Sequence, residues 1–176
     1  STLGIPLPQL AVIGDLLSFM GAIAFVHLIS RRVRFGLIPA LVMSGAYPCI
    51  VFATSGLETM PAVMCVLMGA YALLRRAPLL AGLAFVAGAM MRPDHLLFWG
   101  CGGLALALTD LIGSSGPLLR RLRWGSYLRF SAPLLLVYAP YFIWRMSAYG
   151  EVFPNPYYAK SGHLTYWSQG GAYLSS

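Results

Sequence analysis

Long apolar runs, separated by short charged breaks, are the feature of this chain that most restricts its fold. Such runs cannot cover a water-facing surface, so lipid is the solvent that suits them. In hydrocarbon every backbone amide must be hydrogen-bonded within the protein, which leaves helices and closed barrels as spanning structures. The runs are continuous and lack the two-residue alternation of barrel strands, so we predict helices.

The charge composition supports a membrane protein and argues against a nucleic-acid partner. Only 10% of the 176 residues are charged, whereas soluble domains carry about 25%. The net charge is +7, and 11 of the 12 basic residues are arginine. These arginines lie between the apolar runs, where membrane topology accounts for them, and no nucleic-acid-binding module accompanies them. Three cysteines lie inside apolar runs, without the Cys/His spacing of a zinc site.

The predicted fold class is therefore all-α: a polytopic transmembrane helix bundle of about six spans. Residues 1–145 are expected to form this helical domain, and residues 146–176 an exoplasmic loop or the start of a following region. Prolines within or near the spans predict kinks. The expected spans are residues 10–30, 35–53, 59–74, 78–91, 95–112 and 130–144.

Arginine counts predict the orientation of these spans. With alternating spans, nine basic residues fall on one face and three on the other, a bias that marks the nine-residue face as cytoplasmic. The opposite, exoplasmic face then carries residues 55–58, residues 92–95 and the tail from residue 145. The cytoplasmic set is Arg31, Arg32, Arg34, Arg75, Arg76, Arg120, Arg121, Arg123 and Arg129; the exoplasmic set is Arg92, Arg145 and Lys160.

Two polar motifs at span boundaries have both a structural and a functional interpretation. Ser55 and Glu58 have the spacing of a helix capping box, and Glu58 could equally face an exoplasmic cavity and bind a cation or a sugar hydroxyl. Residues 92–95 suit the start of a helix, with proline at its first position. Their guanidinium, carboxylate and imidazole, from Arg92, Asp94 and His95, also suit a phosphate site with an acid beside it.

The tail and the first span hold the remaining candidates. Residues 149–162 are rich in tyrosine and proline, which is typical of an interfacial belt and also of a loop that covers a sugar site. Asp15 lies near the outer end of the first span, either as a buried functional acid or as a marker of the true start of that span. The tail candidates for substrate binding are Asn155, Tyr157, Tyr158 and Lys160.

Three motifs in order carry a family resemblance. Ser-Gly-Leu-Glu-Thr (55–59) opens a span, Arg-Pro-Asp (92–94) follows one hairpin later, and Tyr-Gly-(x)3-Pro-Asn-Pro-Tyr-Tyr-Ala-Lys (149–160) follows a span ending in residues 140–145. Over about residues 35 to 165 the chain resembles the GT-C class of membrane glycosyltransferases. Within that class it resembles the bacterial terminal β-(1→2)-arabinofuranosyltransferase family, with its relatives known as flagellar motor control proteins.

The resemblance implies a polytopic enzyme of the bacterial inner membrane that moves a sugar from a polyprenyl-phosphate donor to a cell-envelope glycan, with inversion. A carboxylate would deprotonate the acceptor hydroxyl, and cationic groups would stabilise the departing phosphate. Arg92 and Lys160 would meet the lipid phosphate, and Glu58 and Asp94 the sugar or acceptor hydroxyls. Some members of the class use a divalent cation, so no cofactor is assigned.

The chain departs from the family pattern in two ways that bear on catalysis. The middle motif usually has glutamate where this chain has Asp94, and the tail more often has threonine where this chain has Pro156. The family places its general-base aspartate in a first exoplasmic loop for which this chain has no equivalent. We therefore expect a segment of a longer protein whose base lies outside it, with Glu58, Asp94 and Asp15 as weaker candidates.

Two other hypotheses fit the same residues. A transporter or flippase-like protein could bind a lipid-linked substrate through the same phosphate-binding and aromatic groups without chemistry, although no inverted repeat is evident. A non-catalytic membrane scaffold is the other hypothesis, because the expected base is missing.

Overall fold

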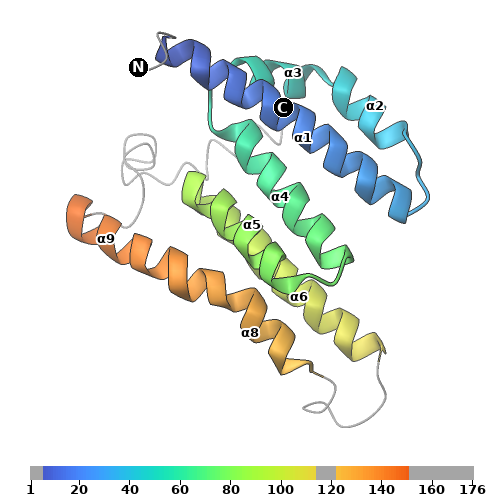
Figure 1. Ribbon diagram of the computed structural model, residues 1–176, viewed down its shortest axis with the longest axis vertical. Helices are drawn as coiled ribbons and strands as arrows, with labels where there is room; N and C mark the ends of the chain where they lie inside the picture. The colour runs from blue at the N-terminus through green and yellow to red at the C-terminus, as the bar shows by residue number, and fades with distance from the viewer. Residues whose placement is uncertain (1–5, 114–121, 151–176) are drawn as a thin grey trace, which may run out of the picture. The chain divides into compact units, whose positions relative to one another are not determined.

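The computed structural model describes residues 6–113 and 122–150, and these form helices joined by short turns, with no β strand among them (Figure 1). The prediction of an all-helical fold is confirmed for these residues. The chain divides into two compact units between Ala139 and Pro140. The helices of the first unit are α1 (Leu7–Arg32), α2 (Ile38–Gly45), α3 (Tyr47–Thr54), α4 (Thr59–Leu74), α5 (Pro78–Met91), the 3₁₀ turn η1 (Pro93–His95), α6 (Leu96–Gly113), α8 (Trp124–Pro133) and the π-helical turn η2 (Leu134–Tyr138).

The described part of the second unit, residues 140–150, consists of helix α9 (Ala139–Tyr149) from Pro140 onward and Gly150. Tyr141 and Trp144, one turn apart, form a ring contact with centroids 6.3 Å apart. Gly150 follows the helix with φ +68°, a left-handed conformation in which glycine carries no Cβ penalty.

Two helices are long and apolar enough to cross a membrane: Leu7–Arg32, and Pro93–Ile112, which joins η1 to α6. Helices α3 and α4 would pass the same test together, but the chain bends by 117° between them, as in a broken span or a re-entrant loop. The described residues therefore hold two candidate spans, or three if the bent pair is one span, against the six expected.

The expected span 35–53 is wrong as a single helix. Ala46 is extended, with ψ 116°, and separates α2 from α3. Pro48 explains the break, because proline lacks the N–H of a continuing helix and its ring clashes with the carbonyl four residues earlier. Both short helices contact α1. Pro133 lies inside the sixth expected span, 130–144, directly before the π-helical turn η2, and this stretch is not among the candidate spans.

The first unit is organised around α4 and α5, which pack against each other. Helix α4 also contacts α1, and α5 also contacts α6 and α8, so α4 lies between α1 and α5 (Figure 1). Phe130 of α8 is 1% exposed and stacks on Trp99 of α6 at 5.3 Å between ring centroids. Phe85 of α5 meets the Phe130 ring edge-on, with 6.2 Å between the ring centroids. These aromatic rings form the centre of the core.

Small residues let these helices approach closely. A Cβ on Gly69 or on Gly102 would lie 2.7 or 2.8 Å from the ring of Phe85. A Cβ on Gly82 would collide with the backbone oxygen of Phe130. Close backbone approach at glycine and alanine is typical of helix packing in membranes, where burial of apolar side chains gives little driving force.

Large apolar side chains cover much of the exterior instead. Leu41, Leu80 and Leu97, for example, are 65%, 60% and 70% exposed. An exterior of this kind is unfavourable in water and favourable in lipid. Composition, helix length and surface thus agree on a membrane protein.

Candidate functional site

Three predicted site residues lie in the turn between α5 and α6. Arg92 ends α5 in an extended conformation, with φ −136° and ψ 113°, as expected for a residue that precedes proline. Pro93 then starts η1, and the His95 amide closes the turn by donating to the Arg92 carbonyl at 2.9 Å. The Arg-Pro pair therefore determines where α5 stops and places Arg92, Asp94 and His95 together.

Arg92 and Asp94 bind each other through two hydrogen bonds. Nε of Arg92 donates to Oδ1 of Asp94 at 3.3 Å, and a terminal nitrogen donates to Oδ2 at 3.2 Å. The two side chains are 39% and 62% exposed. An ion pair this exposed contributes little to stability, about 0–1 kcal/mol. Its two groups are therefore available to a ligand that offers a better partner, such as a phosphate for Arg92.

His95 faces the interior of the first unit. It is 9% exposed, and its Nδ1 is buried without a hydrogen-bond partner among the described residues. Nδ1 lies 3.4 Å from the point that a Cβ on Gly88 would occupy, and the ring meets Phe98 edge-on at 5.2 Å. Buried polar groups in native proteins are usually hydrogen-bonded. His95 Nδ1 is therefore a buried polar atom whose partner the described residues do not supply.

The Ser55–Glu58 turn is not the capping box that its spacing suggested. Ser55 ends α3, and its hydroxyl donates to the Phe52 carbonyl at 3.0 Å. Glu58 is itself the N-cap of α4 and makes no side-chain capping bond. The difference arises because α4 begins at Thr59, directly after Glu58 rather than after Ser55. The exposed Glu58 carboxylate lies at the positive end of the α4 dipole.

Contacts place the α3–α4 turn and η1 at one end of the bundle. A Cβ on Gly56 would lie 3.6 Å from Ala11, near the start of α1. On the other side of α4, the Ala62 carbonyl lies 3.7 Å from the Cβ point of Gly88, the position that His95 also approaches. The first turns of α4 and the η1 turn are therefore close to each other.

Asp15 is a buried acid within α1, which agrees with the first of the two interpretations of this residue and not with its marking the start of the span. It is 3% exposed, and Oδ2 has no hydrogen-bond partner among the described residues. Ser18 and Ala22, three and seven residues later, are buried on the same side of α1. The first span begins at Leu7, so Asp15 lies about two turns inside the helix rather than at its start. An ionisable group at such depth is a functional candidate.

The four tail candidates, Asn155, Tyr157, Tyr158 and Lys160, lie outside the described residues. No group of three or more His, Cys, Asp and Glu side chains that could hold a metal ion is found within residues 6–113 and 122–150. The divalent-cation hypothesis therefore has no ligand set in the described part of the chain.

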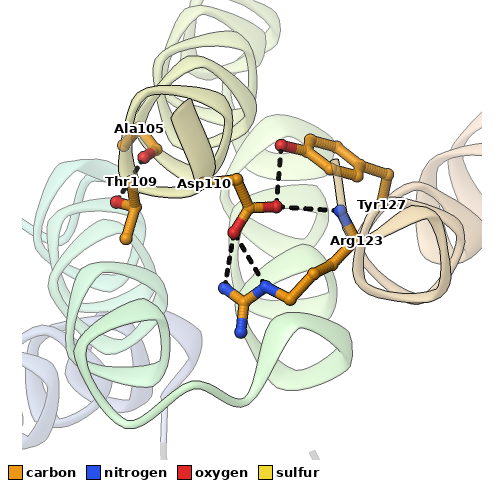
Figure 2. Close-up of polar contacts among 5 residues, drawn as sticks. All are labelled: Ala105, Thr109, Asp110, Arg123 and Tyr127. Carbon is orange, nitrogen blue, oxygen red and sulfur yellow. Dashed lines mark hydrogen bonds and ion pairs between the residues drawn. The ribbon is translucent and has the colours of Figure 1, made fainter. Parts of the chain in front are cut away.

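Sequence reasoning missed a polar cluster at the other end of the bundle (Figure 2). Asp110 of α6 accepts hydrogen bonds from the Arg123 amide at 3.0 Å and from Arg123 Nε at 2.7 Å. The Tyr127 hydroxyl donates to the same carboxylate at 3.3 Å. Burial and the nearby carboxylate raise the pKa of Tyr127 above its ordinary value. An acid at the end of an apolar run, followed 13 residues later by an arginine, was the available signal.

Described arginines of the predicted basic face lie at this end of the bundle: Arg31 and Arg32 end α1, and Arg75 and Arg76 follow α4. The carboxyl ends of α1, α4 and α6 point in one direction (Figure 1). Arg76, after α4, and Arg123, before α8, line one cavity of about 270 Å³ with Thr109 of α6. Arginines far apart in the sequence are thus gathered at one end, away from the η1 turn.

Comparison with known proteins identifies no relative: no family model, no curated protein and no solved structure matches this chain. Over its described residues the chain is all-helical, with two or three candidate membrane spans and an apolar exterior consistent with a membrane protein.

Proposed function

We propose that this chain acts in a membrane glycosyltransferase reaction that moves a sugar such as arabinofuranose from a polyprenyl-phosphate donor to a cell-envelope glycan. The observation that carries the proposal is the η1 turn, which holds the exposed side chains of Arg92 and Asp94 next to the buried imidazole of His95, whose Nδ1 has no hydrogen-bond partner among the described residues. These groups match an anionic phosphate and a hydroxyl-rich sugar.

The proposed chemistry is an inverting displacement. A carboxylate takes the proton of the acceptor hydroxyl, whose oxygen forms a bond to the anomeric carbon as the bond to the lipid phosphate breaks. The phosphate leaves with the electron pair, and Arg92 with Lys160 stabilises its charge. Glu58, Asp94 and His95 hold sugar or acceptor hydroxyls, while Asn155, Tyr157 and Tyr158 cover them. We assign no described carboxylate as the base; Glu58, Asp94 and the buried Asp15 are its weaker candidates.

We place the proposed enzyme in the bacterial inner membrane, with the end of the bundle that carries the η1 turn on the exoplasmic side. The gathering of arginines at the opposite end supports this orientation, because positive residues accumulate on cytoplasmic faces.

The activity test uses purified full-length protein, a radiolabelled polyprenyl-phosphate sugar and a glycan acceptor. Arg92→Ala and Lys160→Ala should each lower transfer by about tenfold or more, because each removes a charged hydrogen bond to the leaving phosphate. Arg32→Ala, at the other end of the first span, is the matched control and should leave transfer unchanged. Full activity in both phosphate-site variants would refute the phosphate assignment.

Orientation is tested separately by cysteine labelling in intact cells. On a background without Cys49, Cys65 and Cys101, Leu57→Cys should react with a membrane-impermeant maleimide from outside. Leu122→Cys should react only after the membrane is opened. Labelling of both positions from the same side would contradict the proposed topology.

A binding or scaffolding role without chemistry is the second candidate. Arg92 and Asp94 are bound to each other in the structure, which is the arrangement expected of a turn that fixes a loop. A protein that binds the polyprenyl-phosphate sugar in a filter assay, yet transfers nothing in the presence of every acceptor and cation tried, would favour this role.

A further inference from the structure

A groove runs between α4 and α5 at the arginine-rich end of the first unit, away from the η1 turn. Its volume is about 790 Å³, within the range of small-molecule sites, about 300–1,000 Å³. Helix α4 with its C-cap contributes Met68, Tyr71 and Arg75, and helix α5 contributes Leu80, Leu83 and Ala87. These positions are spaced by three, four or seven residues, so each helix presents one continuous face to the groove.

One wall of the groove is aromatic. Phe25 of α1 lines it and lies 5.9 Å from the ring of Tyr71, measured between centroids. Small alanines lie between the larger side chains, so the hollow extends along the helices instead of being filled by them. Leu80 and Leu83 are 60% and 43% exposed, which shows that the groove opens to the apolar exterior.

The described lining of the groove has one charged residue, at the end near the α4–α5 turn. Arg75, the C-cap of α4, is the one charged residue among the described residues that line it. Arg75 takes part in neither of the two ion pairs found within residues 6–113 and 122–150. Arg123, by contrast, is already held by Asp110. The groove thus combines a long apolar surface with one uncompensated cation at its end.

We propose that this groove binds one anionic phospholipid, with an acyl chain along α4 and α5 and the phosphate at Arg75. Charge complementarity and polarity both select this occupant: an amphiphile with a negative head matches an apolar channel that ends in a guanidinium. The helices that form the groove belong to a unit with two candidate membrane spans, and in a bilayer its apolar opening would face lipid. The site is separate from the η1 turn and does not depend on the proposed sugar transfer.

The test measures retained lipid by native mass spectrometry. Full-length protein is purified in mild detergent from vesicles of phosphatidylglycerol and phosphatidylcholine in equal amounts. Wild-type protein should retain one phosphatidylglycerol in preference to phosphatidylcholine. Arg75→Gln should lower that retention by about tenfold, because it removes a charged hydrogen bond, whereas the control Arg32→Gln, an exposed arginine that does not line the groove, should retain it as wild type does.

A second variant tests the apolar part of the site. Ala87→Trp places a large ring in the groove and should lower retention of phosphatidylglycerol while helicity by circular dichroism is kept. If Ala87→Trp does not fold, the Arg75 pair still decides the question. Equal retention of the two lipids, equal retention by Arg75→Gln and Arg32→Gln, or displacement of the lipid by millimolar inorganic phosphate alone would each overturn the proposal.

Discussion

Arg123 donates hydrogen bonds to Asp110 from both its backbone and its side chain. The amide donates to Oδ2 at 3.0 Å, and Nε donates to Oδ1 at 2.7 Å. The carboxylate side chain is 4% exposed, whereas the arginine side chain is half exposed. The bond therefore fixes the start of α8 against the end of α6 and compensates a carboxylate that is removed from solvent.

Arg123→Ala should lower the free energy of unfolding by about 2–3 kcal/mol, because the buried Asp110 carboxylate loses its guanidinium partner. Titration with SDS in mixed micelles, followed by circular dichroism, measures the change. The exposed Arg129 of the same helix provides the control, and Arg129→Ala should stay within about 0.5 kcal/mol of wild type. The double variant with Asp110→Ala should cost less than the sum of the two single variants. Additive effects would show that the pair does not act as a unit.

Gly82→Ala should destabilise the protein by about 2 kcal/mol or more, because the new methyl group meets the backbone oxygen of Phe130, which cannot rotate away. Helices α5 and α8 would have to separate. Gly100→Ala is the matched control: nothing lies within 4 Å of its Cβ point, and the change should be neutral or stabilising by up to about 1 kcal/mol. Thermal unfolding in detergent compares them, and a Gly82→Ala variant as stable as Gly100→Ala would contradict the close packing.

Arg76→Gly should stabilise the end of α4 by about 1 kcal/mol. Arg76 has φ +56° at the position after the helix cap, where its amide donates to Leu73 and the Ala77 amide donates to Ala72. This is a Schellman ending, which favours glycine, and a side chain in the left-handed region costs about 1–2 kcal/mol. The neighbour Arg75 has φ −86°, so Arg75→Gly should instead destabilise by about 0.5–1 kcal/mol. Equal signs for the two variants in chemical unfolding would be inconsistent with this geometry.

Asp15→Asn should raise stability and lower function. The change removes a charge that is 3% exposed and has an oxygen without a partner in the described residues, and we expect a gain of about 1–2 kcal/mol in the free energy of unfolding. Sugar transfer should also fall, because Asp15 is a candidate for the general base. Ser18→Ala, on the same face with its hydroxyl bonded to the Gly14 carbonyl, controls for local packing. A loss of stability in Asp15→Asn would reveal that the carboxylate is held by a group not yet described.

Helix boundaries were predictable where charged residues and prolines separate two apolar runs. The runs 59–74 and 78–91 coincide with α4 and α5, because paired arginines and a proline lie between them. The run 35–53 has no charged break, so its division at Ala46 was not foreseen; only the general expectation of proline kinks pointed to it. Counting apolar residues measured the length of this run but could not give its backbone conformation.

The candidate site could likewise be predicted from the sequence only in part. The η1 turn was predictable because a residue before proline leaves the helical region, which brings Arg92, Asp94 and His95 into one turn. The pairing of Asp110 with Arg123 was not, because it depends on how α6 packs against α8. The burial of Asp15 and the free nitrogen of His95 also depend on neighbours from other helices.

The glycines that face Phe85 and the Phe130 carbonyl also bear on how this protein can diverge. Leucines that face lipid can be exchanged for other apolar residues with little consequence, so sequence identity can erode quickly over most of the chain. Positions 69, 82 and 102 have no such freedom unless the opposing ring or backbone changes in the same lineage. Distant relatives should therefore be recognisable less by overall similarity than by small residues at these three positions, with an aromatic residue kept at position 85.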